Sequence, residues 1–260
     1  MRALRIVRAF SDARAEWSLA ELSRELSLSK PTAFRLLGAL EQAELVTRSD
    51  PAGGYRLGPG AIELGARAQR ANTILTAARP ELEALTRETG ETSSVEILAG
   101  AMTLILDEVL GDHRIGTSPS AGTRWPAHAA STGKVLLAAA QEEEPGIARR
   151  LVQEAGGRLA GLTPATIRSA PRLAAELTRV TRQGYSTAIN ELEEGYVALG
   201  APVRRHDGRV IAAISLGGPA TRFTSSRIPR LVRPLREAAV RISRRLGWHD
   251  TPGPGGRSSP

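Results

Sequence analysis

Apolar residues recur at helical spacing in two short neighbouring segments near the start of the chain. Ser18 and Glu21 have the spacing of a capping box, which predicts a helix beginning at Leu19. The polar corner at residues 27–29 ends this helix, and a second one is expected to run to about Glu44. The predicted apolar stripes are Leu22 and Leu26 in the first helix, and Ala33, Leu36 and Leu40 in the second.

Two short helices joined by a corner of this length are typical of a helix-turn-helix, whose second helix lies in the major groove of DNA. Strand-like runs at residues 45–48 and 55–57, separated by a turn sequence, predict a hairpin wing. The alternative is an ordinary helical hairpin with a solvated polar face. The outward side chains of types that bond phosphates or base edges are Ser29, Lys30, Thr32 and Arg35 on the second helix and Arg48 and Arg56 on the wing, and these are the candidate DNA-binding residues.

Beyond the wing, the pattern predicts a linker helix over residues 59–73. Ile62 and Leu64 are its only large apolar residues, too few for it to fold alone, so we expect it to pack on a partner. The expected domains are therefore a winged helix-turn-helix domain over residues 1–58, the linker helix, and a larger domain over residues 74–248. The Pro/Gly/Ser-rich residues 249–260 are predicted to be a disordered tail.

The larger domain has strand patterns first, then helices, then strands again. Strands are expected at 95–98, 103–109, 185–189, 197–203 and 210–216, with helices at 74–88, 131–140, 145–154 and 173–182 between or before them and a basic helix at 226–246. Residues 111–128 are expected to be irregular. This order predicts an α+β domain with a mostly antiparallel sheet. The whole chain is therefore expected to be α+β, with a helical winged helix-turn-helix domain at its N-terminus.

Composition adds limits on the class of protein. A chain of 260 residues with 41% hydrophobic and 24% charged residues is long enough for two globular domains. No cysteine is present, which excludes disulfides and thiolate metal sites. No signal-peptide pattern and no apolar run of about 20 residues occur, so a cytoplasmic protein without membrane contact is expected. The net charge of +8 is concentrated at the two ends of the chain, which is typical of a protein that contacts nucleic acid through a terminal module.

The motifs together resemble the IclR family of bacterial transcriptional regulators. The resemblance is carried by residues 18–37 and 55–58 in the first domain, and by residues 128–134, 184–186, 201–203 and 213–219 in the second, all in family order. It implies a second domain of GAF-like topology that binds a small organic acid, and a homodimer or homotetramer on a palindromic operator in double-stranded DNA.

The effector residues implied by the resemblance are Ser131, Thr132 and Gly133 at a helix start, Ala198 on one strand, and Ser215 and Gly217 on another. Free amides at a helix start favour a carboxylate, and Ser215 could add a hydroxyl donor. Ordinary helix capping is the alternative explanation for the Ser/Thr pair. Many members have cysteine at Ala198 and serine at Gly217, so the resemblance implies a less polar pocket than that of members binding very small ketoacids.

Catalytic and metal sites find little support. The segment 127–135 lacks the first glycine of a phosphate-binding loop, and the four histidines stand at no ligand spacing. A hydrolase using Ser215 with His128 is the one formal enzymatic alternative, and no third triad member is visible. We therefore expect a non-enzymatic, effector-modulated regulator, a repressor, without metal or cofactor. The other alternative is a constitutive DNA-binding repressor whose second domain only dimerises.

Overall fold

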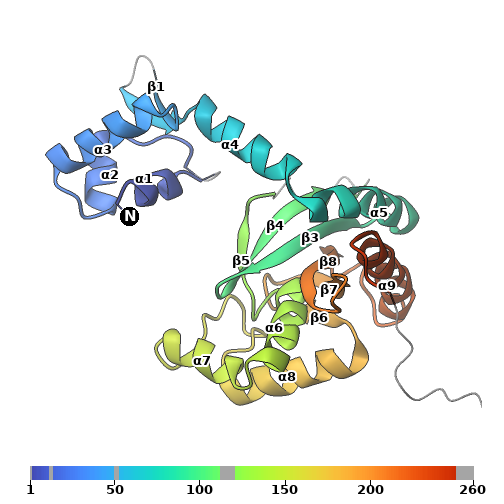
Figure 1. Ribbon diagram of the computed structural model, residues 1–260. Coiled ribbons are helices and arrows are strands. Elements are labelled where there is room, and N and C mark those ends of the chain that lie inside the picture. Colours follow the sequence, from blue (N-terminus) through green and yellow to red (C-terminus); the bar gives the residue numbers. More distant parts are fainter. Residues whose placement is uncertain (1, 12–13, 50–52, 112–120, 250–260) are drawn as a thin grey trace, which may run out of the picture. The chain divides into compact units, whose positions relative to one another are not determined.

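The computed structural model describes residues 2–11, 14–49, 53–111 and 121–249. The chain divides into two compact units, Met1–Asn72 and Thr73–Pro260, and each has its own hydrophobic core. The predicted α+β class is confirmed, with a helix-turn-helix unit followed by a larger unit that contains an antiparallel sheet (Figure 1). Within the described residues, every helix is too short or too polar to cross a bilayer.

The first unit is a winged helix-turn-helix. Its elements are α1 (Arg2–Ala9), α2 (Leu19–Glu25), α3 (Lys30–Gln42), β1 (Val46–Ser49), β2 (Gly54–Leu57) and α4 (Pro59–Arg70). The core is formed by Ile6, Trp17, Leu22, Leu37, Leu40, Val46 and Tyr55. The predicted stripe of α3 needs one correction, because Leu37 is fully buried whereas Leu36 is only partly buried.

The predicted capping box is present at the start of α2. The Ser18 amide donates to the Glu21 carboxylate at 2.9 Å, and the Glu21 amide donates to the Ser18 hydroxyl at 3.3 Å. These bonds satisfy two amides that the helix itself cannot satisfy, an arrangement that stabilises a helix by about 1 kcal/mol. The corner that follows is tight because Ser27 adopts a left-handed backbone conformation with φ of 53°.

The wing is an antiparallel pair with Val46 opposite Leu57 and Ser49 opposite Gly54. Part of the predicted turn, residues 50–52, lies outside the described residues. Trp17 extends this small sheet, since its amide and carbonyl both bond the backbone of Tyr55. That bridge was not predicted, because one residue between two helices carries no strand pattern.

The second unit is built on one sheet. Its strands are β3 (Thr92–Ala99), β4 (Met102–Val109), β5 (Arg124–Pro126), β6 (Ser186–Ile189), β7 (Tyr196–Arg204) and β8 (Val210–Pro219). In the described part of the chain they pair in the order β5-β4-β3-β8-β7-β6, all antiparallel. The short strand β5 lies in a segment expected to be irregular, of which residues 112–120 lie outside the described residues; three residues ending in proline give no strand signal.

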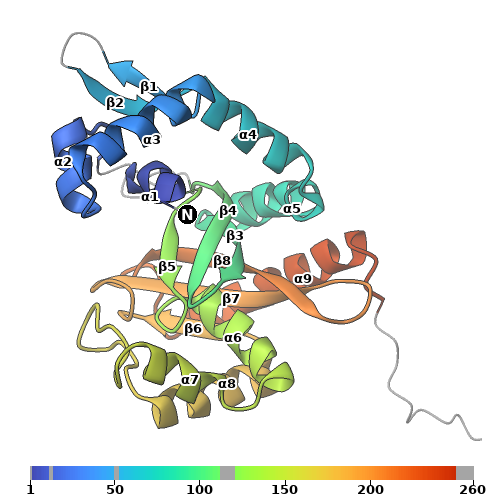
Figure 2. The same cartoon turned by 60° about the vertical axis from the view of Figure 1, so that its left-hand side comes forward.

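Helices cover both faces of this sheet. They are α5 (Thr73–Thr89), α6 (Ser131–Glu143), α7 (Ile147–Glu154), α8 (Ala170–Gln183) and α9 (Ile228–Arg245). Leu199, Ile214 and Leu216 pack with α5 and α9 on one face, whereas Ala213 packs with α6, α7 and α8 on the other. Figure 2 shows the two groups of helices on opposite sides of the strands. The predicted tail beyond His249 lies outside the described residues.

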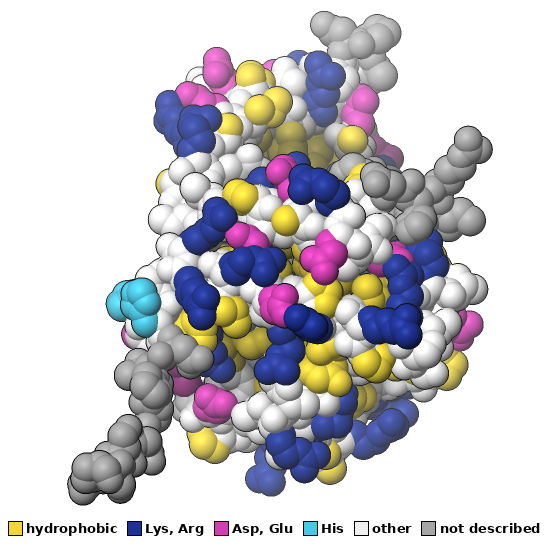
Figure 3. Space-filling view, turned by 90° about the vertical axis from the view of Figure 1, so that its right-hand side faces the viewer, with side chains coloured by type: hydrophobic (Ala, Val, Ile, Leu, Met, Phe, Trp, Pro, Cys, Tyr) yellow, Lys and Arg dark blue, Asp and Glu magenta, His cyan; other side chains and the backbone are white. Residues whose placement is uncertain are grey.

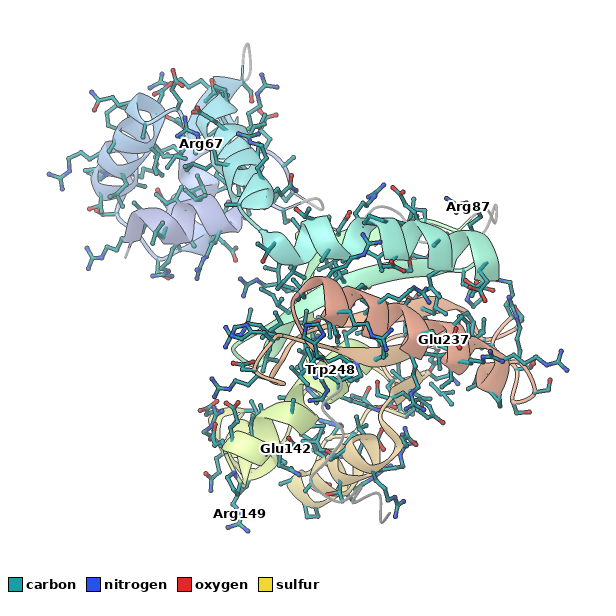
Figure 4. The ribbon with its side chains drawn as sticks, turned by 45° about the vertical axis from the view of Figure 1, so that its right-hand side comes forward. Arg67, Arg87, Glu142, Arg149, Glu237 and Trp248 are labelled. Carbon is teal, nitrogen blue, oxygen red and sulfur yellow. The ribbon has the colours of Figure 1, made fainter. Side chains whose placement is uncertain are left out.

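Several arginines of the basic helix α9 form internal ion pairs. Arg241 and Arg245 bond the nearly buried carboxylate of Glu81 on α5 at 2.6 and 2.9 Å. Arg233 pairs with Glu237 one turn later on the exposed side of α9, where Glu237 is labelled in Figure 4. Basic side chains are spread over the face seen in Figure 3, with acidic side chains among them. Part of the positive charge of α9 therefore fixes α9 to α5.

Candidate functional site

The outward face of α3 carries the residues predicted to bind DNA. Ser29, Lys30 and Arg35 are exposed, and Thr32 is half-buried. The Ser29 hydroxyl donates to the Thr32 hydroxyl at 2.8 Å, so these two side chains are ordered together at the helix start. Within the described residues, Lys30 and Arg35 form no ion pair, which leaves both charges available to phosphates or base edges.

The two wing arginines have different surroundings. Arg48 lies 3.4 Å from the Glu41 carboxylate and 5.6 Å from the centre of the Tyr55 ring. Arg56 is exposed and forms no ion pair in the described part of the chain. Arg56 is therefore the freer of the two for contact with a phosphate.

Two features beside α3 were not predicted from the sequence. Phe34 is 53% exposed on the same helix as Lys30 and Arg35, so a large apolar side chain lies near the candidate DNA-binding residues. Arg2 and Arg5 of α1 border a hollow that Ser29 and Thr32 also line. The packing of α1 against α3 brings these two arginines to this position.

A cavity of about 370 Å³ lies in the second unit between the sheet and the start of α6. Four of the predicted effector residues line it: Ser131 and Thr132 of α6, Ala198 of β7 and Ser215 of β8. The other two, Gly133 and Gly217, are not among the lining residues. A Cβ atom on Gly133 would overlap the backbone of Ala127, and one on Gly217 would overlap the Tyr196 hydroxyl, so both glycines allow close packing of the wall.

Strand alternation explains why polar side chains collect on this face of the sheet. Ser94 lies opposite Ser215 on the neighbouring strand, and Gly217 lies opposite Ala198. Side chains two residues apart point to the same side of a strand, which places Glu96 beside Ser94 on the cavity wall. Val95 between them points to the opposite face and is buried in the other core.

Glu96 was not predicted as a site residue. Its carboxylate accepts hydrogen bonds from the Thr132 hydroxyl at 2.6 Å and the Ser94 hydroxyl at 3.0 Å. The Ser94 hydroxyl also bonds the Ser215 hydroxyl at 2.7 Å. Burial raises the pKa of Glu96, and the hydrogen bonds from Thr132 and Ser94 oppose that rise. The available signal was the alternation of polar Ser94 and Glu96 with apolar Val95 and Ile97 in β3.

Lys134, two residues into α6 from Thr132, is only 1% exposed. Its ammonium bonds Glu191 at 2.5 Å, Glu176 at 3.1 Å and the Thr187 carbonyl at 3.0 Å. It thus connects α6 with α8 and with the turn between β6 and β7. Leu192 and Glu193 of that turn line the cavity, so Lys134 fixes part of the cavity wall.

The pairing needed for the hydrolase alternative is not formed. His128 Nε2 lies 2.9 Å from the Ala160 carbonyl, and the Ser215 hydroxyl bonds Ser94 instead. Burial lowers the pKa of His128, which favours its neutral form. In the described part of the chain, no group of three or more His, Asp or Glu side chains is arranged to hold a metal ion.

Comparison with known proteins identifies both units. The model of the IclR helix-turn-helix domain matches residues 1–50, and that of the bacterial transcriptional regulator IclR C-terminal domain matches residues 66–244. The HTH-type transcriptional regulator XynR of Escherichia coli K12 is 31% identical over 247 residues, which are 95% of this chain and 96% of XynR. The repressor AllR of the same strain is 28% identical over 95% of this chain and 89% of AllR.

Solved structures agree with these matches. The crystal structure of an IclR homologue from Microbacterium hydrocarbonoxydans in complex with 4-hydroxybenzoate has a TM-score of 0.81 and 26% identity, covering 94% of this chain and 97% of that one. Because the family models match most of the chain, and the match runs through both units in the same order, this protein belongs to the IclR family of bacterial transcriptional regulators.

Proposed function

We propose that this family member is a repressor that binds a palindromic operator through α3 and responds to a small organic effector bound in the cavity beside α6. The DNA-binding part of the proposal rests on Lys30, Arg35 and Arg56, whose exposed charges have no partner in the described part of the chain. The similarity to AllR, which is named as a repressor, supports the direction of regulation. The proposed function involves no catalysis.

The observation that carries the effector proposal is the cavity itself. A volume of about 370 Å³ suits a small organic molecule, and the wall combines apolar side chains such as Ile105 and Ala198 with a few polar ones. The homologue that binds 4-hydroxybenzoate supports an organic acid of about this size. An effector acts on operator binding only to the extent that it prefers one conformational state of the regulator over another.

Self-association is part of the proposal. Ile62 on α4 is 74% exposed, and burial of this large apolar side chain against a partner would be favourable. A second copy of α4 would cover Ile62 and hold two α3 helices for two half-sites of a palindrome. Light scattering of the Ile62→Asp variant, expected to be more monomeric than the parent, tests this step.

The experiment for the whole proposal has two stages. A genome-wide map of bound sites gives the operator, and fluorescence anisotropy with that operator then measures release by candidate acids. Release by an acid that also raises the melting temperature of the protein supports the effector function, because a ligand specific for the native state stabilises it. Operator binding that no acid changes, together with an unshifted melting temperature, would favour the constitutive repressor whose second domain only dimerises.

A further inference from the structure

We propose that Glu96 sets the chemical class of the effector: the deep end of the cavity binds a hydrogen-bond donor, a hydroxyl or a protonated amine, and rejects a carboxylate. The proposal rests on the proposed function, since it assumes that the effector occupies the cavity beside α6. It adds the orientation in which the effector lies in the cavity. An organic acid must then place its carboxylate away from Glu96 and its donor group toward it.

The hydrogen bonds around Glu96 all run in one direction. Thr132 donates to one carboxylate oxygen and Ser94 donates to the other. Since Ser94 has a single hydroxyl proton and gives it to Glu96, the bond between Ser94 and Ser215 requires Ser215 as the donor. All three hydroxyl protons therefore point along a chain that ends at Glu96, and none of them is left for a ligand.

This chain of hydrogen bonds reverses the role expected of Ser215. The sequence favoured Ser215 as a donor to a ligand carboxylate, but its proton is committed to Ser94 and only its lone pairs remain for a ligand. Glu96 likewise retains acceptor capacity, because a carboxylate can accept about four hydrogen bonds. Glu96 and Ser215 thus present acceptors to the cavity, and acceptors bind donors.

The charge of the cavity lining also disfavours a ligand carboxylate beside Glu96. Glu96 already provides the anion near the positive end of the α6 dipole, through its bond to Thr132 in the first turn. Glu193 also lines the cavity, and none of its described lining residues is a lysine or arginine. A ligand carboxylate placed beside Glu96 would face a like charge in a partly desolvated site, which is unfavourable.

The remaining wall favours a ligand of a particular shape. Ile105, Leu192 and the aromatic rings of Trp125 and Tyr196 also line the cavity, and Trp125 is 36% exposed whereas Glu96 is 6% exposed. Aromatic rings bind apolar bodies and, face-on, organic cations. The matching ligand has a ring-sized apolar body with a hydroxyl or ammonium group at its inner end.

The test uses four para-substituted benzoates that differ in one group. They are 4-hydroxybenzoate, 4-(aminomethyl)benzoate, benzoate, and terephthalate, which has a second carboxylate. Isothermal titration of the full-length protein gives the dissociation constants. We expect one of the two donor compounds to bind at least about tenfold more tightly than terephthalate, and more tightly than benzoate, because a site built for a donor is left unpaired by an analogue that lacks it. The hydroxyl and ammonium compounds then distinguish the two kinds of donor.

The decisive variant is Glu96→Gln, which keeps an oxygen for Thr132 and adds an amide donor. We expect it to bind the preferred donor compound about tenfold more weakly and terephthalate more tightly than the wild type does. Glu194→Gln, which removes an exposed carboxylate from the neighbouring turn but is not among the residues that line the cavity, is the matched control and should keep the wild-type order of affinities.

Three outcomes would overturn the proposal. Wild-type protein that binds terephthalate or benzoate as tightly as the donor compounds contradicts it, as does a Glu96→Gln variant that binds in the wild-type order. Both leave the effector function of the cavity intact. If no compound binds and none releases the operator, the effector function for this chemical class fails, and the proposal fails with it.

Discussion

The hydroxyl of Tyr196 lies where a Cβ atom on Gly217 would stand. Gly217 pairs with Ala198 across β7 and β8, and Ala198 is two residues from Tyr196 on the same face of its strand. The missing side chain at 217 therefore lets the hydroxyl end of Tyr196 approach β8 closely in the cavity wall. Burial raises the pKa of the Tyr196 hydroxyl, as does the negative charge of Glu108, so this hydroxyl stays protonated at neutral pH.

We expect Gly217→Ala to displace the Tyr196 ring. Forcing an extra carbon into a packed wall costs about 1–3 kcal/mol of stability, and the changed wall should also weaken ligand binding. Urea denaturation measures the first effect and titration with a bound acid the second. The double variant with Tyr196→Phe is the control, since removal of the hydroxyl relieves the overlap and should recover part of the loss. A single variant as stable as the parent would show that the wall adapts freely.

Replacement of Glu96 should stabilise the protein in a pH-dependent way. Because the pKa of Glu96 is raised in the folded state, the ionised carboxylate is favoured less there than in the unfolded chain. The resulting penalty is absent below the unfolded pKa and grows as pH rises toward the folded pKa. Each unit of pKa difference corresponds to about 1.4 kcal/mol.

Glu96→Gln removes the ionisable group, so we expect a higher free energy of unfolding than in the wild type at pH 8 and a smaller difference at pH 4. Denaturation curves at both pH values provide the measurement. Glu193→Gln, at an exposed position, should show no comparable change with pH. A Glu96→Gln advantage that is equal at pH 4 and pH 8, or a loss of stability at pH 8, contradicts the raised pKa.

Alanine variants of the DNA-binding face should distinguish residues that contact bases from residues that contact phosphates. We expect Arg35→Ala to weaken operator binding by about 1–3 kcal/mol while changing binding to unrelated duplexes less, if Arg35 contacts a base edge. Arg56→Ala on the wing should weaken binding to all duplexes alike and reduce the slope of log affinity against log salt by about 1. Anisotropy titrations at several salt concentrations distinguish the two patterns.

Arg149→Ala is the matched control for these variants, because Arg149 is an exposed arginine on α7 in the other unit (Figure 4). It should leave both affinity and salt slope unchanged. A uniform loss for Arg35→Ala would make Arg35 a phosphate contact, and no loss for either α3 or wing variant would remove the support for this DNA-binding surface.

Local patterns in the sequence predicted the elements of the fold well. The capping box at Ser18 and the apolar spacing in α2 and α3 are signals that a few neighbouring residues carry, and the structure confirms them. The strands of the second unit other than β5 were also located, because β-branched and apolar runs end at glycines. The pairing of Trp17 with Tyr55 depends on residues far apart in the chain, so no local pattern indicates it.

The residues of the candidate cavity were predicted only in part, because residues far apart in the chain come together there. Ser131, Thr132, Ala198 and Ser215 were named through a family resemblance, and they line the cavity. Glu96 was missed because a glutamate in a strand is normally interpreted as a solvent-facing residue, and only α6 packed over the sheet buries it. Lys134 was noted only for its place in the motif, since its three partners come from segments more than 40 residues away.

Replacement of Lys134 should lower the free energy of unfolding. Its ammonium is the cation between two carboxylates, Glu191 and Glu176, and almost no solvent reaches it. Burial raises the pKa of Glu191, and the charge of Lys134 opposes that rise. Lys134→Met keeps the length of the apolar stem but leaves Glu191 without its cation, whereas Glu176 keeps its ion pair with Arg179 at 2.7 Å. Breaking a buried pair from one side costs about 3–5 kcal/mol, so we expect a loss of that size in urea denaturation.

The double variant Lys134→Met with Glu191→Gln separates the charge effect from packing. Because it removes the more deeply buried carboxylate together with its cation, we expect it to be more stable than Lys134→Met alone, and at pH 8 more clearly than at pH 4, where Glu191 with its raised pKa is more often protonated. Ligand affinity of the double variant then reports on the turn at Leu192 and Glu193. If the double variant is no more stable than the single one, unpaired charge is not the cause of the loss, and Lys134 contributes mainly through the packing of its stem.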